Sequence, residues 1–238
     1  MIGVETAPTH TAASGRTRKA WYAAPYPSSF HWHEDIKYVP WRAPGPGSYA
    51  LKRDITVLFI GSTRASQRGA RQLRTALHAQ CRKHNTCLWH ETSHSCNGVV
   101  NASHTMLMFK KAVFCPAPAG DSITRKSIFD SLASGCIPVL FSKASLRLYS
   151  LHISEAQMDK ISVYIPLHDV LTEDADFVHI LNAISSEKIL EMQKEIEMIA
   201  PTLQYAVVPS RLGDIGEWSY LHITAVSMVT LLYFGCRL

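Results

Sequence analysis

A chain of 238 residues, 47% hydrophobic and 18% charged, has the composition of a globular protein, which excludes a fibrous or wholly disordered one. The net charge of +5 is spread along the chain without a stripe of basic and aromatic residues, so we do not expect a nucleic-acid partner. Six cysteines are too few for a disulfide-rich scaffold.

The first part of the chain predicts little regular structure. Residues 1–20 are rich in Thr, Ala and Ser and lack the apolar core of a signal peptide, so we expect a disordered tail. Residues 21–53 are rich in Pro and aromatic residues, which indicates an extended or loop segment. We assign the folded domain to residues 54–238. Its longest apolar run, Ile223 to Phe234, falls short of the roughly 20 residues of a membrane span, so we expect a soluble product.

The domain opens with a strand and a helix. Residues 55–60 are a continuous apolar run rich in β-branched residues, typical of a buried strand in a parallel sheet. Gly61 ends the run, and apolar residues at every fourth position predict a helix over 69–83. Residues 84–104 are polar and are interpreted as a long loop.

The same alternation continues to the end of the domain. Apolar periodicity predicts further elements, and Gly135 is the expected residue just beyond one of the helices. Strands that alternate with helices predict an α/β fold with a Rossmann-like, doubly wound parallel sheet. The predicted elements are a helix over 106–111, a strand over 113–115, a helix over 123–134, strands over 136–141 and 161–166, and helices over 177–184 and 189–199.

The cysteines fall into two groups. Cys81, Cys87 and Cys96 lie close together in a polar stretch, which is compatible with one local disulfide in an oxidising compartment. Cys115 and Cys136 lie in apolar runs and are expected in the core.

The most informative segment is 118–130. Gly120 shapes a turn after a strand, and Asp121 and Ser122 are typical N-cap residues, so we expect a helix to begin there and to offer its backbone N–H groups to an anion. Arg125 and Lys126 then fall in the first turn, where the helix dipole disfavours cations unless an anion such as pyrophosphate is bound. Alternatively, Lys126 pairs with the aspartate four residues on, and Arg125 faces solvent.

This segment resembles a known family. Residues 120–139, which read Gly-Asp-Ser-Ile-Thr-Arg-Lys-Ser-Ile-Phe-Asp-Ser-Leu-Ala-Ser-Gly-Cys-Ile-Pro-Val, are similar without a gap to the motif of the exostosin glycosyltransferases, and most of all to the branch that includes plant xyloglucan galactosyltransferases. The resemblance runs from about residue 22 to the C-terminus. It includes Pro25 to His31, Leu58 to Gly61 followed by Arg64 and Arg74, Ile161 to Pro166, and residues 189–193.

The resemblance implies the C-terminal, donor-binding half of a two-domain GT-B glycosyltransferase. Such an enzyme would be an inverting, metal-independent hexosyltransferase that needs no cofactor and moves a sugar, galactose for instance, from a UDP-sugar to a glycan or polysaccharide in the Golgi. Only about fifty residues come before the first predicted strand, so we expect this chain to lack the half that would supply much of the acceptor site and the general base. Leu167 stands where the family usually carries Glu. No catalytic residue is therefore assigned.

The resemblance also assigns binding roles, residue by residue. The diphosphate would be contacted by side chains of the helix start, the ribose by a carboxylate, and a glycine would let the backbone approach the ligand. These residues are Ser122, Thr124, Arg125 and Lys126 for the diphosphate, Asp130 for the ribose, Gly120 for the close approach, and Arg64 as a further diphosphate or sugar contact.

The sequence also allows other functions. The chain could be a non-catalytic or truncated nucleotide-sugar-binding module, or, on net charge alone, a nucleic-acid-binding protein. An exposed interface left by a missing half would favour homo- or hetero-oligomers. Three smaller patterns carry weaker hypotheses: Asp174 and Asp176 as helix-capping acids, Cys87, His90, His94 and Cys96 as a zinc set less favoured than a disulfide or free thiols, and His31 and His33 as packing or surface residues rather than substrate contacts.

Overall fold

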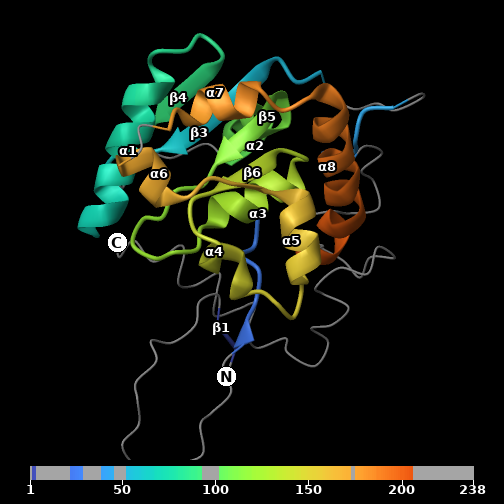
Figure 1. Ribbon diagram of the computed structural model, residues 1–238. Coiled ribbons are helices and arrows are strands. Elements are labelled where there is room, and N and C mark those ends of the chain that lie inside the picture. Colours follow the sequence, from blue (N-terminus) through green and yellow to red (C-terminus); the bar gives the residue numbers. More distant parts are fainter. Residues whose placement is uncertain are drawn as a thin grey trace, which may run out of the picture.

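A computed structural model describes residues 2–3, 22–28, 39–45, 52–92, 102–172 and 175–205 of the chain. At its centre lies a sheet of parallel strands in the order β4-β3-β5-β6-β7 (Figure 1). These strands are β3 (Ile55–Gly61), β4 (Cys87–Glu91), β5 (Ala112–Pro116), β6 (Ile137–Leu140) and β7 (Val163–Tyr164).

Helices connect and cover the strands (Figure 1). They are α1 (Arg68–Cys81), α2 (Ala102–Lys111), α3 (Lys126–Ala133), α4 (Ala144–Arg147), α5 (Glu155–Ile161), α6 (Leu167–Thr172), α7 (Phe177–Asn182), α8 (Ser186–Ile199) and the 3-10 helix η1 (Ala200–Leu203). In the described residues no helix is long and apolar enough to cross a membrane.

The two faces of the sheet carry different helices. Val57 belongs to the core cluster that holds Leu73 and Leu77 of α1, whereas its neighbour Leu58 belongs to the cluster that holds Phe109 of α2. Because successive residues of a strand point to opposite faces, α1 and α2 lie on opposite sides of the sheet. The predicted doubly wound α/β architecture is confirmed.

The segment before the sheet contributes to the core. Within the predicted tail, β1 (Ile2–Gly3) pairs in parallel with β2 (Tyr22–Ala23); the rest of residues 1–20 lies outside the described residues. Tyr26 and Trp41 are buried, with 4% and 2% of their surface exposed. The Tyr205 hydroxyl donates to the carbonyl of Pro25 over 2.9 Å, so residues near both ends of the described chain meet.

The segment that contains Trp41 crosses the end of α3 at Gly135. This glycine has a φ of +67°, the left-handed conformation expected of a residue just beyond a helix, and a Cβ atom there would lie 3.1 Å from the Cα of Trp41. The prediction for Gly135 is confirmed, and glycine is required there for both its dihedral angle and its size.

Some elements were not predicted. The stretch interpreted as a loop over 84–104 contains the edge strand β4, and the prediction was wrong there because the strand ends in the polar, exposed residues His90 and Glu91 and so lacks a long apolar run. Helices α4, α5 and α6 were also missed, although Ser154 and Gln157 form a capping box that marks the start of α5.

Two disulfides tie neighbouring elements together. Cys81 at the end of α1 is bonded to Cys87 at the start of β4, which is one of the local pairings the sequence allowed; Cys96 lies outside the described residues. Cys115 and Cys136 are buried in the core as predicted, and they are also bonded to each other between β5 and β6.

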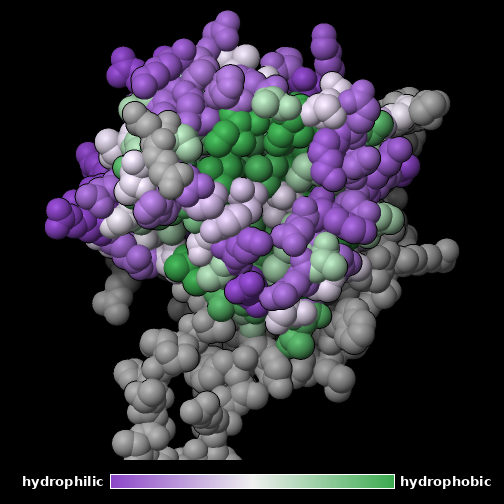
Figure 2. Space-filling view, in the orientation of Figure 1, coloured by the Kyte–Doolittle hydropathy of each residue, from purple (hydrophilic) through white to green (hydrophobic). Residues whose placement is uncertain are grey.

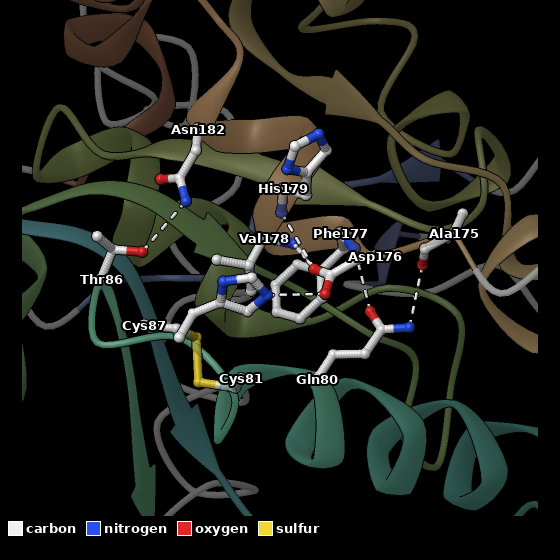
Figure 3. A network of polar contacts seen from close by, with 11 residues as sticks. Gln80, Cys81, Thr86, Cys87, Ala175, Asp176, Phe177, Val178, His179 and Asn182 are labelled. Atoms are coloured by element: carbon white, nitrogen blue, oxygen red, sulfur yellow. Dashed lines mark hydrogen bonds and ion pairs between the residues drawn. A yellow bond between two sulfur atoms is a disulfide. The ribbon is translucent and has the colours of Figure 1, made fainter.

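A polar network links the C-terminal end of α1 to the start of α7 (Figure 3). The Gln80 side chain donates to the carbonyl of Ala175 and accepts from the N–H of Phe177, both over 3.0 Å. Asp176 lies 2.7 Å from the His84 ring and caps α7 by accepting from two backbone N–H groups. The predicted capping role is confirmed for Asp176, whereas Asp174 lies outside the described residues.

Candidate functional site

The candidate site lies at the carboxyl ends of β3 and β5. The chain leaves β3 toward β4 on one side and later returns to β5 on the other side, so the direction of winding reverses between β3 and β5. In open α/β sheets, ligands bind at such a reversal, outside the carboxyl ends of the strands. Two loops meet there: residues 62–67 after β3 and residues 117–125 after β5.

The loop after β5 differs from its prediction. Helix α3 begins at Lys126 with Arg125 as its N-cap residue, so the expected helix start at Asp121 and Ser122 was wrong. The polar groups of the loop bind other partners instead: the Ser122 hydroxyl donates to the carbonyl of Thr124 over 2.9 Å, and Asp121 accepts from the Ser66 hydroxyl over 2.8 Å. These contacts hold the segment in a turn outside the helix.

An open pocket of about 220 Å³ lies at this turn. Four of the predicted binding residues line it together, and the carboxylate of Asp121 and the ring of Tyr26 complete it. The lining residues are Tyr26, Asp121, Ser122, Thr124, Arg125 and Lys126. The four residues that the sequence assigned to the diphosphate therefore lie in a single pocket.

Arg125 and Gly120 fit against each other. A Cβ atom on Gly120 would collide with the guanidinium group of Arg125. Among described glycines only Gly135 has a positive φ, so Gly120 is needed for space rather than for backbone conformation. The close neighbour of Gly120 within the chain is thus Arg125, and the approach of its backbone to a ligand stays a prediction.

Lys126 and Asp130 form an ion pair within α3. The Lys126 ammonium lies 2.7 Å from each carboxylate oxygen of Asp130, whose side chain is only 8% exposed. The Lys126–Asp130 pair, which the sequence offered as an alternative to a bound anion, is therefore present. Each carboxylate oxygen has two lone pairs, so Asp130 can bind the lysine and still accept a further hydrogen bond.

Thr124 is held from behind. Its hydroxyl lies 2.9 Å from that of Tyr149, and both residues are buried. This contact fixes Thr124 in the pocket wall, where it lines the pocket beside Ser122. The hydroxyl of Ser145, on α4, donates to the carbonyl of Ile123 over 2.8 Å and anchors the same turn.

Arg64 is placed apart from the other predicted residues. It is exposed in the loop after β3 and does not line the pocket. Its backbone N–H is held by the Ser62 hydroxyl over 3.0 Å. Since Ser66, two residues on, contacts Asp121 of the pocket, the Arg64 loop adjoins the site.

Tyr26 was missed as a site residue. It reaches the pocket from a segment about a hundred residues earlier in the chain, and its ring packs 6.1 Å from that of Phe129 on α3. Its place in the Pro-Tyr-Pro segment was the available signal, but spacing alone does not connect that segment to α3.

The arrangement is suited to holding an anion. Arg125 and Lys126 stand at the N-terminus of α3, where the backbone N–H groups and the helix dipole favour negative charge. Ser122 adds a hydroxyl to the same wall. A phosphate or diphosphate group matches this set of donors.

The proposed zinc set is not assembled in the part of the chain that the structure describes. Cys87 is bonded to Cys81, and no group of three metal-binding side chains occurs among the described residues. His94 and Cys96, as well as His31 and His33, lie outside those residues.

Comparison with known proteins indicates the same family as the motif in residues 120–139. The sequence profile described as the Exostosin GT47 domain matches residues 8–184. Two similar proteins are the probable xyloglucan galactosyltransferases GT15 and GT12 of Arabidopsis thaliana, 31% identical over 199 residues and 33% identical over 206 residues. A third is the xyloglucan galactosyltransferase MUR3 of the same plant, 30% identical over 192 residues.

These matches cover most of this chain but a smaller share of each relative. They span 82%, 86% and 80% of this chain, against 40%, 37% and 30% of GT15, GT12 and MUR3. The chain therefore spans less than half the length of these relatives.

Proposed function

The chain belongs to the exostosin GT47 family, and from this premise we propose that its described part is the nucleotide-sugar-binding half of a glycosyltransferase. The donor is a UDP-sugar, and the acceptor is a glycan or polysaccharide. One parallel sheet with helices on both faces is consistent with one half of a GT-B enzyme.

A single observation carries this proposal: Ser122, Thr124, Arg125 and Lys126 line one pocket at the point where the sheet reverses its direction of winding. The family resemblance had assigned these four residues to the diphosphate. A diphosphate in this pocket would lie at the N-terminus of α3, where its charge is favoured.

The proposed sugar is galactose. Support comes from the names of the relatives, which are described as xyloglucan galactosyltransferases or probable ones. A xyloglucan-like chain is accordingly the first acceptor to test.

We propose a metal-independent, inverting transfer. Arg125, Lys126 and the first turn of α3 supply positive charge for the leaving diphosphate, as a metal ion does in other enzymes. An inverting transfer also needs a base near the acceptor hydroxyl. The two carboxylates at the site are engaged, Asp121 with Ser66 and Asp130 with Lys126, so we assign the base to the other half of the enzyme.

The proposed compartment is the lumen of the Golgi. Two disulfides lie in the described residues, and such bonds persist in oxidising compartments. Fractionation of cells that naturally produce the protein would test this assignment. Recovery in a reducing compartment would contradict it.

Calorimetry tests donor binding. UDP and UDP-galactose should bind the purified 238-residue chain with a stoichiometry near one, and GDP-sugars should bind more weakly. Absence of any UDP binding by the folded chain would refute the proposal.

A radiolabelled transfer assay tests the division of labour. The chain alone should bind donor but transfer galactose to xyloglucan fragments poorly, because holding both reactants together accounts for roughly 7–11 kcal/mol of a barrier. Robust turnover by the monomeric chain would show instead that it contains a complete acceptor site.

Association with another chain is also proposed. Figure 2 shows a group of apolar side chains between α7 and α8, surrounded by hydrophilic ones. A contiguous apolar surface of this kind favours a protein contact. Light scattering over a range of concentrations would reveal self-association, and a strictly monomeric chain would limit the partner to a different protein. The apolar run Ile223 to Phe234 lies outside the described residues.

A further inference from the structure

Arg74 of α1 is buried beneath the two loops of the site. Only 4% of its surface is exposed. Its guanidinium donates to the carbonyl of Ser62 over 2.6 Å, to that of Ala119 over 2.8 Å and to that of Pro118 over 3.1 Å. Ser62 follows β3, whereas Pro118 and Ala119 follow β5, so one side chain holds both loops.

We propose that Arg74 is a positioning residue, whose guanidinium sets the spacing of the 62–67 and 117–125 loops and so the shape of the anion pocket. The proposal rests on the proposed function in one respect, namely that the pocket binds the donor diphosphate. Arg74 is not among the residues that line the pocket, and it acts through the backbone of the loops.

The chemistry of arginine suits this task. A guanidinium is planar and presents its donors in a rigid fork, so it can satisfy three carbonyl oxygens at fixed angles, whereas a lysine ammonium is a single point on a flexible stem. The plane of Arg74 is also supported from the strand, because its guanidinium carbon lies 5.5 Å from the centre of the Phe59 ring. Trp89 stacks on Phe59, with 3.9 Å between ring centres.

The charge of Arg74 is unusual for a buried residue. Within the described part of the chain it forms no ion pair; its hydrogen-bond partners are neutral carbonyl groups. Its pKa is lowered to about 10, chiefly by burial and then by the nearby charge of Arg125, while Asp121 and Glu91 oppose the change. Arg74 therefore remains protonated at neutral pH and adds a positive charge beneath the pocket.

A second tie closes the same two loops from the solvent side. Asp121 accepts from the hydroxyl of Ser66 over 2.8 Å, and the Gln67 side chain donates to the carbonyl of Asp121 over 3.0 Å. Arg74 below and Asp121 above thus bind the 62–67 loop to the loop that carries the pocket. A loop fixed at both levels is pre-organised for a ligand.

The experiment compares Arg74→Lys, which keeps the charge but loses the fork, with Arg74→Met, which loses both. Arg82→Met is the matched control, because it removes an exposed cation at the far end of the same helix. Hydrogen exchange of the 62–67 and 117–125 loops is measured without ligand. Calorimetry with UDP follows, well below the melting temperature of each variant.

Both Arg74 variants should exchange faster in the two loops but not in α8. Both should bind UDP at least about tenfold more weakly, because a displaced loop would lose at least one charge-assisted hydrogen bond to the ligand. Arg82→Met should match the parent in both measurements. Parent-like exchange in Arg74→Lys, or parent-like UDP affinity, would overturn the positioning role. If Arg74→Lys kept the exchange and UDP affinity of the parent while Arg74→Met lost them, the charge of Arg74 alone would matter.

The experiment distinguishes failure of the proposed function from failure of the positioning role, and it remains decisive if a variant does not fold. If the parent does not bind UDP, the proposed function fails, but exchange without ligand still tests the connection between the loops. If Arg74→Lys does not fold, the parent decides: UDP should slow exchange in both loops together. Protection confined to residues 117–125 would overturn the inference.

Discussion

The guanidinium group of Arg125 occupies the space in which a side chain at Gly120 would begin. The backbone of Gly120 does not have a positive φ, so alanine is compatible with its conformation and only the contact with Arg125 stands against it. The two residues are five positions apart on the turn that forms the pocket. A larger residue at position 120 should therefore displace the side chain of Arg125.

Gly120→Ala is expected to displace Arg125 and to weaken UDP binding while leaving the melting temperature nearly unchanged. An arginine side chain can move aside, so the cost falls on ligand binding rather than on folding. Calorimetry and thermal unfolding of the same sample would measure both. Gly69→Ala is the control: no atom lies within 4 Å of a Cβ there, and UDP affinity should stay that of the parent.

Arg125→Ala should weaken UDP binding by about 1.5–3 kcal/mol, the typical contribution of a hydrogen bond to a charged group. Arg147→Ala provides a comparison, because it removes an exposed arginine paired with Glu155 at 3.3 Å, away from the pocket residues. Titration calorimetry would report both affinities. Equal UDP affinity in Arg125→Ala and the parent would remove Arg125 from the diphosphate site.

Asp130→Ala separates a ribose contact from a purely structural ion pair. If the carboxylate accepts hydrogen bonds from ribose hydroxyls, the variant should bind UDP more weakly and inorganic pyrophosphate nearly as well as the parent. If Asp130 serves only to hold Lys126, both ligands should lose affinity equally, since the lysine would lose its partner at 2.7 Å. Competition titrations with the two ligands would decide.

Asp176→Ala should lower the free energy of unfolding by about 0.5–2 kcal/mol at neutral pH, because Asp176 caps α7. Burial tends to raise the pKa of Asp176, but hydrogen bonds from His84 and the N–H groups of His179 and Val178 outweigh it and hold the pKa below its usual value. The stabilisation from ionised Asp176 is thus complete above the unfolded pKa of about 3.9 and is lost as pH falls through the lower folded value.

Urea unfolding at neutral and acidic pH would measure this dependence. The difference between the parent and Asp176→Ala should shrink below about pH 4. Asp159→Ala, at a side chain 75% exposed, should show little difference at either pH. A gap for Asp176→Ala that grows with acidity would contradict the assigned role of the carboxylate.

The sequence predicted the parts of the fold whose residues are buried on both sides. Strands β3 and β6 are uninterrupted apolar runs, and Gly135 marks the end of α3 as expected. Strand β4 escaped because it is an edge strand, whose exposed positions break the apolar run. Helices α4 and α6 are single turns or little more, too short for a periodic pattern to appear.

The site was predictable only where it is local in sequence. Ser122, Thr124, Arg125 and Lys126 lie within five consecutive residues and were found together. Tyr26 and Arg74 reach the site through tertiary structure, so their parts could not be inferred from spacing. The wrong helix start has a related cause: Asp121 is a good N-cap in isolation, but in the fold its carboxylate is used by Ser66.

The position of Trp41 and Tyr26 in the core has a consequence for biosynthesis. The N–H of Ala43 reaches the carboxylate of Glu197 over 3.1 Å, a contact between residues 154 positions apart. At a synthesis rate of about 5–20 residues per second, the first partner waits roughly 8–30 seconds for the second to be made. Phe129 and Gly135, which Tyr26 and Trp41 contact, are also made about a hundred residues later, so the aromatic side chains leave the ribosome before the residues that cover them.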